Sequence, residues 1–348
     1  MSADVMDDDK FVSVDERAWH PLGYHFDHDM SAVDGWNAMG GGFEMYKKPV
    51  GVMLTDEFLE VPGHCAIVRG PSNKDNRNIV FDYVTDNYNI VQPYDLVKKF
   101  EEKVGISISS MGFLQEGRKQ FITWKLKMMD IIAGDEVQLY GNLLMGTDSK
   151  FSAMVSVLMT RTVCLNTFKS AIAESEEEDK SGRNRGRGTV YAGRHNNPNL
   201  LEDLGEWMGF VQDNVEKRTQ SLTNLFRGFA STPIIHEKQA IDLIGDTWTL
   251  PNPVPNDYPE ALREKAEKKV EAEIKKVERI REGVFDAFNT NAFDVSTDPT
   301  LWKLFNAGTW YFNHGVGGNR DASYSILYGD RNAQMNRFAQ VLKDSMAK

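Results

Sequence analysis

The chain has 348 residues, of which 41% are hydrophobic and 26% charged, so wholesale disorder is excluded and a sizeable core can form. Its formal net charge of −11 at pH 7 excludes a surface that is basic throughout. A nucleic-acid site would therefore have to be a local basic patch on an acidic protein. The two cysteines, Cys65 and Cys164, are too few for a disulfide framework and are typical of a reducing cytoplasm.

The N-terminal segment, residues 1–17, carries several aspartates and lacks both the basic start and the apolar stretch of a signal peptide. No run in the sequence reaches the roughly 18 to 20 apolar residues that a membrane helix needs. We therefore expect a cytoplasmic protein that makes no membrane contact and has a mobile acidic tail at residues 1–17.

Residues 18–250 predict a core domain of the α+β class. The first expected elements are a helix at Ser31–Met39, strands at Val50–Leu59 and Cys65–Arg69, and a helix at Tyr94–Val104. Strand-like runs follow at Ser107–Leu114, Gln120–Met129, Val137–Met145 and Ser152–Thr160, and then a helix at Arg161–Ala173. Alternation with a period of two is clearest in Gln120–Met129. The pattern predicts an antiparallel sheet with a β-β-β-α unit, packed by helices.

The remainder of the sequence changes character twice. Residues 174–199 are rich in charge and glycine and predict a mobile loop. Helical spacing returns at Leu200–Phe229, and four prolines mark a linker at residues 251–259. Residues 260–348 predict a helical C-terminal region, which begins with a long charged helix at Glu260–Phe288. The thin apolar stripe of that helix suits a contact with another subunit or a partner.

Familiar catalytic motifs are missing from the sequence. Neither a phosphate-binding Gly-x-x-x-x-Gly-Lys-Ser/Thr loop nor a dinucleotide-binding Gly-x-Gly-x-x-Gly pattern occurs. The spacing of His20, His25 and His28 matches no zinc pattern, so local hydrogen bonding is favoured over a metal site. Cys164 has no readable base partner, which favours a small buried helix cysteine over a nucleophile.

A basic cluster in the glycine-rich segment is the strongest charge signal. Its members are Arg183, Arg185, Arg187 and Arg194, with Tyr191 and His195 nearby. Flexible Arg-Gly segments bind single strands through charge and through stacking on bases, and a solvated loop is the alternative. Seven further aromatic side chains are assigned to the core instead of a base-stacking surface, namely Phe121, Trp124, Phe151, Trp302, Phe305, Trp310 and Tyr311.

Several segments in a fixed order resemble a phage- and plasmid-borne family of unknown function, domain of unknown function 932. The segments are Ala18–Gly23, Tyr88–Pro93, Gly117–Gln120 leading into Phe121–Leu126, Arg161–Thr167, and Leu301–Ala307 with Tyr311 and His314. The resemblance covers most of the chain, from about residue 18 to 340. It implies a protein of a mobile element in a bacterial host cell.

The chain also resembles, more weakly, the single-strand annealing proteins of phages. This resemblance rests on the β-β-β-α pattern and on the lack of an ATP-binding motif. That resemblance implies an oligomer that holds one DNA strand in a basic groove and exposes its bases to a complementary strand. The phosphate contacts it implies are Arg118, Lys119, Lys125 and Lys127 on the hairpin, and Arg161 and Lys169 on the following helix. We expect Lys125 and Lys127 to share a strand face with Thr123. A solvated polar face is the alternative for Arg161 and Lys169.

The expected function is therefore ATP-independent binding and annealing of single-stranded DNA by a homo-oligomer that needs no cofactor. A Mg²⁺ dependence of DNA binding and a phage or host recombination partner stay open. A protein-interaction or host-inhibitor protein without DNA binding is a second hypothesis, because it suits the acidic surface. A metal-dependent nuclease using Asp82, Asp86 or Asp95 is a third, and it requires paired carboxylates on adjacent strands.

Overall fold

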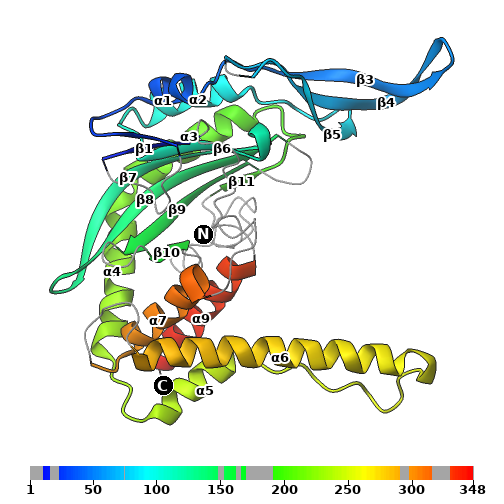
Figure 1. Cartoon of the computed structure of the whole chain (residues 1–348). Helices are drawn as coiled ribbons and strands as arrows, with labels where there is room; N and C mark the ends of the chain where they lie inside the picture. Colours follow the sequence, from blue (N-terminus) through cyan, green and yellow to red (C-terminus); the bar gives the residue numbers. More distant parts are fainter. Residues whose placement is uncertain are drawn as a thin grey trace.

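The structure, a computed structural model, has mixed α+β architecture, as the sequence predicts. It describes residues 11–15, 23–73, 75–147, 153–161, 166–169, 191–290, 298–315 and 330–347. A curved main sheet, a smaller sheet that carries a projecting hairpin, and a group of C-terminal helices make up these residues (Figure 1).

The main sheet is built around a long antiparallel hairpin, β7 (Lys119–Ile132) and β8 (Asp135–Gly146). The strand order is β10-β9-β8-β7-β6-β1-β2, and β11 pairs with β9. The remaining strands are β1 (Phe11–Val14), β2 (Tyr24–Phe26), β6 (Ser110–Leu114), β9 (Ala153–Arg161), β10 (Asn166–Lys169) and β11 (Tyr191–Gly193). Neighbouring pairs are antiparallel except for β1 and β2, which are parallel.

One face of the main sheet is covered by α1 (Ala32–Ala38), α2 (Pro93–Lys103) and α3 (Leu200–Asp213) (Figure 1). Ser31 caps α1 by accepting a hydrogen bond from the backbone of Asp34 at 3.0 Å, which satisfies a free helix donor. On β7 the alternate residues point into this layer, and Trp124 meets Phe100 of α2 with ring centroids 5.3 Å apart. The other residues of β7 therefore face away from these helices.

The smaller sheet consists of β3 (Met45–Leu54), β4 (Glu57–Arg69) and β5 (Ile79–Thr85) in that order. Because β5 pairs only with His64–Arg69, the outer part of the β3–β4 hairpin is two-stranded. This hairpin, called the arm below, projects from the body (Figure 1). Its outer end, Gly51–Glu60, is called the arm tip.

The C-terminal part is helical. Its helices are α4 (Val215–Ser231), α5 (Glu237–Thr247), α6 (Glu260–Thr290), α7 (Leu301–Trp310), which continues into the π-helical turn Tyr311–Gly315, and α9 (Asp330–Met346). Helix α4 packs against β7, α7 and α9, while α5 packs against α6 and α9. The first half of α6 extends beyond the other helices (Figure 1). Buried side chains from both sheets and the C-terminal helices form one continuous hydrophobic cluster.

Several local predictions are wrong, and three of them concern strands of the main sheet. Phe11–Val14, expected in the mobile tail, form the buried strand β1, because their apolar side chains pack in the core between β6 and β2. Asn166–Lys169 form β10 on the edge of β9 instead of belonging to a helix, since pairing with β9 satisfies their backbone. Tyr191–Gly193, expected in the mobile loop, form β11.

Candidate nucleic-acid interface

The face of the main sheet opposite α1, α2 and α3 carries a continuous row of polar side chains. Strand register places one residue opposite the next across six strands: His25, Ser13, Ser110, Thr123, Asn142 and Ser156. Thr123 precedes Trp124, whose ring faces α2, and successive side chains of a strand point to opposite faces. This set is called the polar row.

Neighbouring members of the polar row are hydrogen-bonded in pairs. The Ser13 hydroxyl lies 3.2 Å from Nδ1 of His25, and the Thr123 and Ser110 hydroxyls are 2.7 Å apart. At the other end the Asn142 amide donates to the Ser156 hydroxyl at 3.1 Å. Asn142 and Ser156 are fully buried, whereas Thr123 is half-buried and His25 is exposed. Buried polar groups need such partners, so the row is a built feature of the sheet.

Strand β7 adds positive charge and an aromatic ring to the same face. Lys119, Phe121, Thr123 and Lys125 alternate along it, and all four are half-buried. The Lys125 ammonium lies 3.5 Å from the carboxylate of Asp15. The face therefore offers two lysines and one aromatic ring beside hydroxyl groups, which are the groups that contact nucleic-acid backbones and bases.

Two of the residues predicted to contact phosphates, Arg118 and Lys127, instead form contacts within the protein. The guanidinium of Arg118 lies 4.8 Å from the Phe81 ring centre and donates to the carbonyls of Val80 and Phe81, so it joins β5 to the main sheet. The ammonium of Lys127 donates to the Glu216 carboxylate of α4 at 2.6 Å.

The prediction that Lys127 shares a face with Thr123 is wrong. The register shifts between Lys125 and Met128, and Met128 instead of Lys127 lies opposite Gln138. A bulge of this kind inserts one residue and turns the following side chains over.

The other basic candidates are scattered. Arg194 is exposed and follows Gly193, which pairs with Ala153 at the end of the sheet where Lys119 lies. Arg161 and Lys169 are placed by their backbone only, in β9 and β10. Arg183, Arg185 and Arg187 lie outside the described residues, as do His20, Phe151 and Cys164.

The aromatic residues near the Arg-Gly segment are part of the core instead of a stacking surface. Tyr191 is buried and its hydroxyl donates to Asp203 at 3.1 Å. His195 is buried and stacks on Tyr88 at 4.6 Å. Core positions are confirmed for Trp124, Trp302, Phe305 and Tyr311, while Phe121 and Trp310 are half-buried.

The carboxylates of the nuclease hypothesis do not gather in the described structure. Asp95 pairs with Lys98 at 2.8 Å, and Asp82 accepts from the backbone of Tyr83 at 2.8 Å. Within the described ranges, no group of three or more His, Cys, Asp or Glu side chains is placed to hold a metal ion. The nuclease hypothesis therefore gains no support from these residues.

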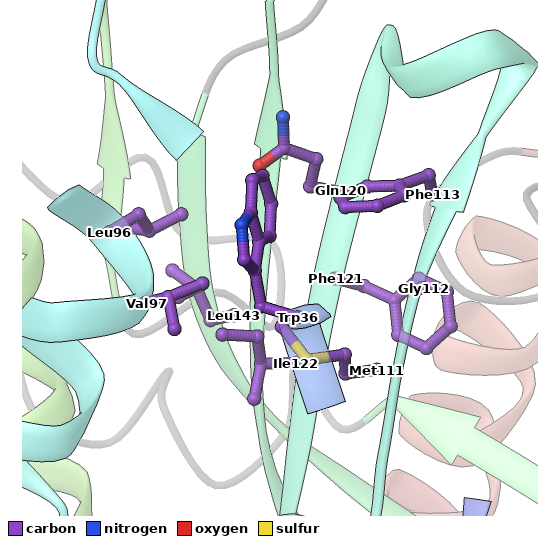
Figure 2. A pocket seen from close by; sticks show the side chains of 10 residues that line it. All are labelled: Trp36, Leu96, Val97, Met111, Gly112, Phe113, Gln120, Phe121, Ile122 and Leu143. Atoms are coloured by element: carbon purple, nitrogen blue, oxygen red, sulfur yellow. The ribbon is translucent and has the colours of Figure 1, made fainter. Parts of the chain in front are cut away.

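A small cavity lies between the helix layer and the main sheet. It measures about 10 Å³, room for about one water molecule. Figure 2 shows the Trp36 ring at its centre, with Leu96 and Val97 of α2 on one side and the Gln120 amide at one end. The amide nitrogen of Gln120 is buried without a hydrogen-bond partner. The cavity is too small for a nucleotide or a substrate, and it is a feature of core packing.

The polar row as a whole cannot be identified from the sequence. Thr123 is recognisable because it alternates with apolar residues in a single strand, whereas His25 stands out only as one of three nearby histidines. Asn142 and Ser156 could have been found because each is a polar residue flanked by apolar residues in its strand, at a position where alternate residues share one face. Which strands are neighbours, and in what register, cannot be read from that signal.

The fold defines an α+β protein with a helix-covered sheet whose second face carries the polar row among apolar side chains such as Leu144 and Leu158. The family described as Domain of unknown function (DUF932) matches residues 80–340, and the chain belongs to this family. The match begins in β5, so it leaves out β3 and β4 of the arm. No curated protein and no solved structure matches the chain. Among the described helices, none combines the length and the apolar character needed to cross a membrane.

Proposed function

We propose that this protein binds single-stranded DNA and promotes the annealing of complementary strands without ATP, as an oligomer that serves a phage or plasmid. The observation that carries the proposal is the polar row, flanked on β7 by Lys119 and Lys125. The antiparallel sheet with helices on one face is consistent with the weak resemblance to annealing proteins, which is an analogy of fold.

The binding mode follows from the chemistry of the face. Lysines neutralise phosphates, the half-buried hydroxyls of Ser110 and Thr123 hold the sugar-phosphate backbone, and Phe121 offers a stacking surface. The bases of the held strand then remain available for pairing. This mode needs no covalent step and no cofactor, and Mg²⁺ would act only on the DNA or its contacts.

Lys125→Gln is expected to weaken binding of a labelled single-stranded oligonucleotide and to reduce the slope of log affinity against log salt by about 1. The reason is that one phosphate contact, with its released counterion, is lost. Fluorescence anisotropy over a salt series measures both quantities. Lys268→Gln is the matched control, because Lys268 lies exposed on α6 beside Glu264. Equal slopes for the two variants would place the binding site elsewhere.

Addition of the complementary strand tests annealing itself. The wild-type protein is expected to accelerate duplex formation in the absence of nucleotide. Failure of the wild-type protein to bind the oligonucleotide even at low salt would overturn the proposed function.

A second candidate function, protein interaction, is favoured by the arm tip. Five of its apolar side chains are between 43% and 64% exposed: Val52, Met53, Leu54, Phe58 and Leu59. The register pairs Val52 with Leu59 and Met53 with Phe58, so both faces of the hairpin are apolar. The tip also carries Asp56, Glu57 and Glu60 and no basic residue, a composition that repels DNA. Within the annealing proposal, the tip supplies a contact between copies of the chain.

Met53→Ser combined with Phe58→Ser is expected to shift the protein toward smaller assemblies, because exposed apolar patches of this kind are characteristic of protein interfaces. Light scattering after size exclusion, over a range of concentrations, measures the change. Val80→Ser is the control, since Val80 is equally exposed but lies on β5. A wild-type protein that is monomeric at every concentration would rule out self-association and favour a different protein partner.

A further inference from the structure

The root of the arm, where β3, β4 and β5 form three paired strands, has two unlike faces. One face packs in the core through buried residues such as Cys65, Ile67 and Val84. The opposite face of such a sheet is ordinarily polar. Here it carries the rings of Tyr46 and Tyr83, which are 38% and 48% exposed. Exposed rings grouped on one sheet face indicate a surface that receives a ligand.

The rings on this face are held in fixed positions. His64 and Tyr83 stack with centroids 4.8 Å apart and planes inclined by only 3°. The Lys48 ammonium lies 5.6 Å from the Tyr46 ring centre. The Tyr46 hydroxyl donates to the Glu44 carboxylate at 3.0 Å, and this hydrogen bond raises the pKa of Tyr46. The phenol therefore stays neutral, with its ring tethered at one end.

Register leaves space between the two ring groups. Lys48, Ala66 and Tyr83 lie opposite one another across the three strands. Neighbouring strands are about 4.8 Å apart, so the Cα atoms of Lys48 and Tyr83 are separated by roughly 10 Å. Ala66 between them has no side-chain atom beyond Cβ. Ala66 thus separates Lys48 from the stacked His64–Tyr83 pair, and this exposed patch on the arm root is called the trough below.

We infer that this trough binds bases of a single-stranded nucleic acid, with Tyr46 and Tyr83 as stacking surfaces and Lys48 as a phosphate contact. This inference rests on the proposed function and adds a second binding site to it. Base stacking on aromatic side chains is tolerant of sequence, as annealing of arbitrary strands requires. Lys48 distinguishes this face of the arm root from the acidic arm tip, and the combination of a lysine with exposed rings suits the phosphates and bases of a nucleic acid.

Most residues of the trough lie outside the part of the chain that matches the family. Tyr46, Lys48 and His64 lie before residue 80, outside the part of the chain that matches the family. Arg118 bonds the carbonyls of β5 to the start of the hairpin that carries Lys119 and Lys125. The trough and the polar face of the main sheet are thereby joined by one structural arginine.

The test compares Tyr83→Ala with Tyr83→Phe in the full-length protein, with a labelled oligothymidylate as the probe. Stacking needs the ring and not the hydroxyl, so we expect Tyr83→Ala to bind roughly tenfold more weakly and Tyr83→Phe to bind like the wild-type protein. The slope against salt should stay unchanged in both, because no ionic contact is removed. Tyr258→Ala is the matched control, since Tyr258 is 38% exposed before α6.

The outcomes separate this inference from the proposed function. If the wild-type protein and Tyr83→Ala bind the probe equally, the trough is overturned while the proposed function stands. If the wild-type protein does not bind, both are overturned. Circular dichroism of Tyr83→Ala confirms that it is folded, and weaker binding by Tyr46→Ala supplies an independent confirmation from a different strand.

Discussion

Asp75→Ala is expected to lower the free energy of unfolding by about 3 to 5 kcal/mol, because it leaves the buried guanidinium of Arg69 without its acidic partner. The side chain of Arg69 is only 3% exposed, and its Nη1 donates to Asp75 at 3.0 Å. The guanidinium also lies 4.8 Å from the Phe43 ring centre. Without the carboxylate, Arg69 keeps its charge in this site and loses its acidic partner. Chemical denaturation at neutral pH measures the loss.

The acid dependence of stability provides a second signature of the same site. Hydrogen bonds from Arg77 and Arg69 hold the pKa of Asp75 well below its usual range. A carboxyl whose folded-state pKa is lowered contributes stability above its unfolded pKa of about 3.9, and this contribution is lost as the pH falls toward the folded value. The wild-type protein should therefore lose stability below about pH 4 more steeply than Asp75→Ala.

Arg77→Ala serves as the control for Asp75→Ala. The Arg77 Nε lies 2.8 Å from the same carboxylate, but its side chain is 63% exposed. An exposed ion pair is worth about 1 kcal/mol or less, so this variant should change stability only slightly. Equal losses for Arg77→Ala and Asp75→Ala would contradict the argument, because burial of Arg69 would then have no special weight.

Local sequence patterns were sufficient to predict the main hairpin. The expected strands Gln120–Met129 and Val137–Met145 correspond to β7 and β8, and the turn between these two strands contains Gly134, which has a positive φ of 81°. Pro93 likewise begins α2 at its first turn. In each case neighbouring residues alone determine the conformation, through side-chain periodicity, a proline φ or a glycine φ.

Features that depend on pairing between distant segments were missed. The expected strand Val50–Leu59 is wrong, because the turn between β3 and β4 lies inside it, and β4 then runs on through Pro62 and Gly63 to Arg69. Pairing with β3 on both sides of these residues keeps the strand continuous, with an irregularity between Pro49 and Gly51. The arm is therefore longer than local propensity indicates, and its exposed tip and trough could not be anticipated.

The candidate site was predictable only within one strand. Thr123 and Lys125 do share a face, but a bulge removes Lys127 from it. The polar row joins residues 13 to 156, and only the order and register of six strands bring them together. The register between strands, which cannot be read from the sequence, therefore determines which residues the candidate site contains.

Trp302→Ala is expected to destabilise the protein by about 3 to 5 kcal/mol, because it opens a cavity in the C-terminal core. The Trp302 ring packs on Phe226 at 5.0 Å and on Phe305 at 5.6 Å. Its indole nitrogen donates to the Asp135 carboxylate at 2.7 Å, and both residues are buried. Asp135 begins β8, so this contact ties the turn of the main hairpin to α7. Denaturant unfolding followed by far-ultraviolet circular dichroism measures the loss.

Two conservative variants separate packing from hydrogen bonding at this contact. Trp302→Phe keeps most of the ring and removes the indole donor, so it should cost about 1 to 3 kcal/mol. Asp135→Asn retains an oxygen that can accept the hydrogen bond from Trp302 but removes the negative charge. It should therefore lower the free energy of unfolding by less than Trp302→Phe does. Trp310→Phe, at a half-buried site on the same helix, is the control and should stay within about 1 kcal/mol. A Trp302→Phe variant as stable as the wild-type protein would show that ring packing alone joins the sheet to the C-terminal helices.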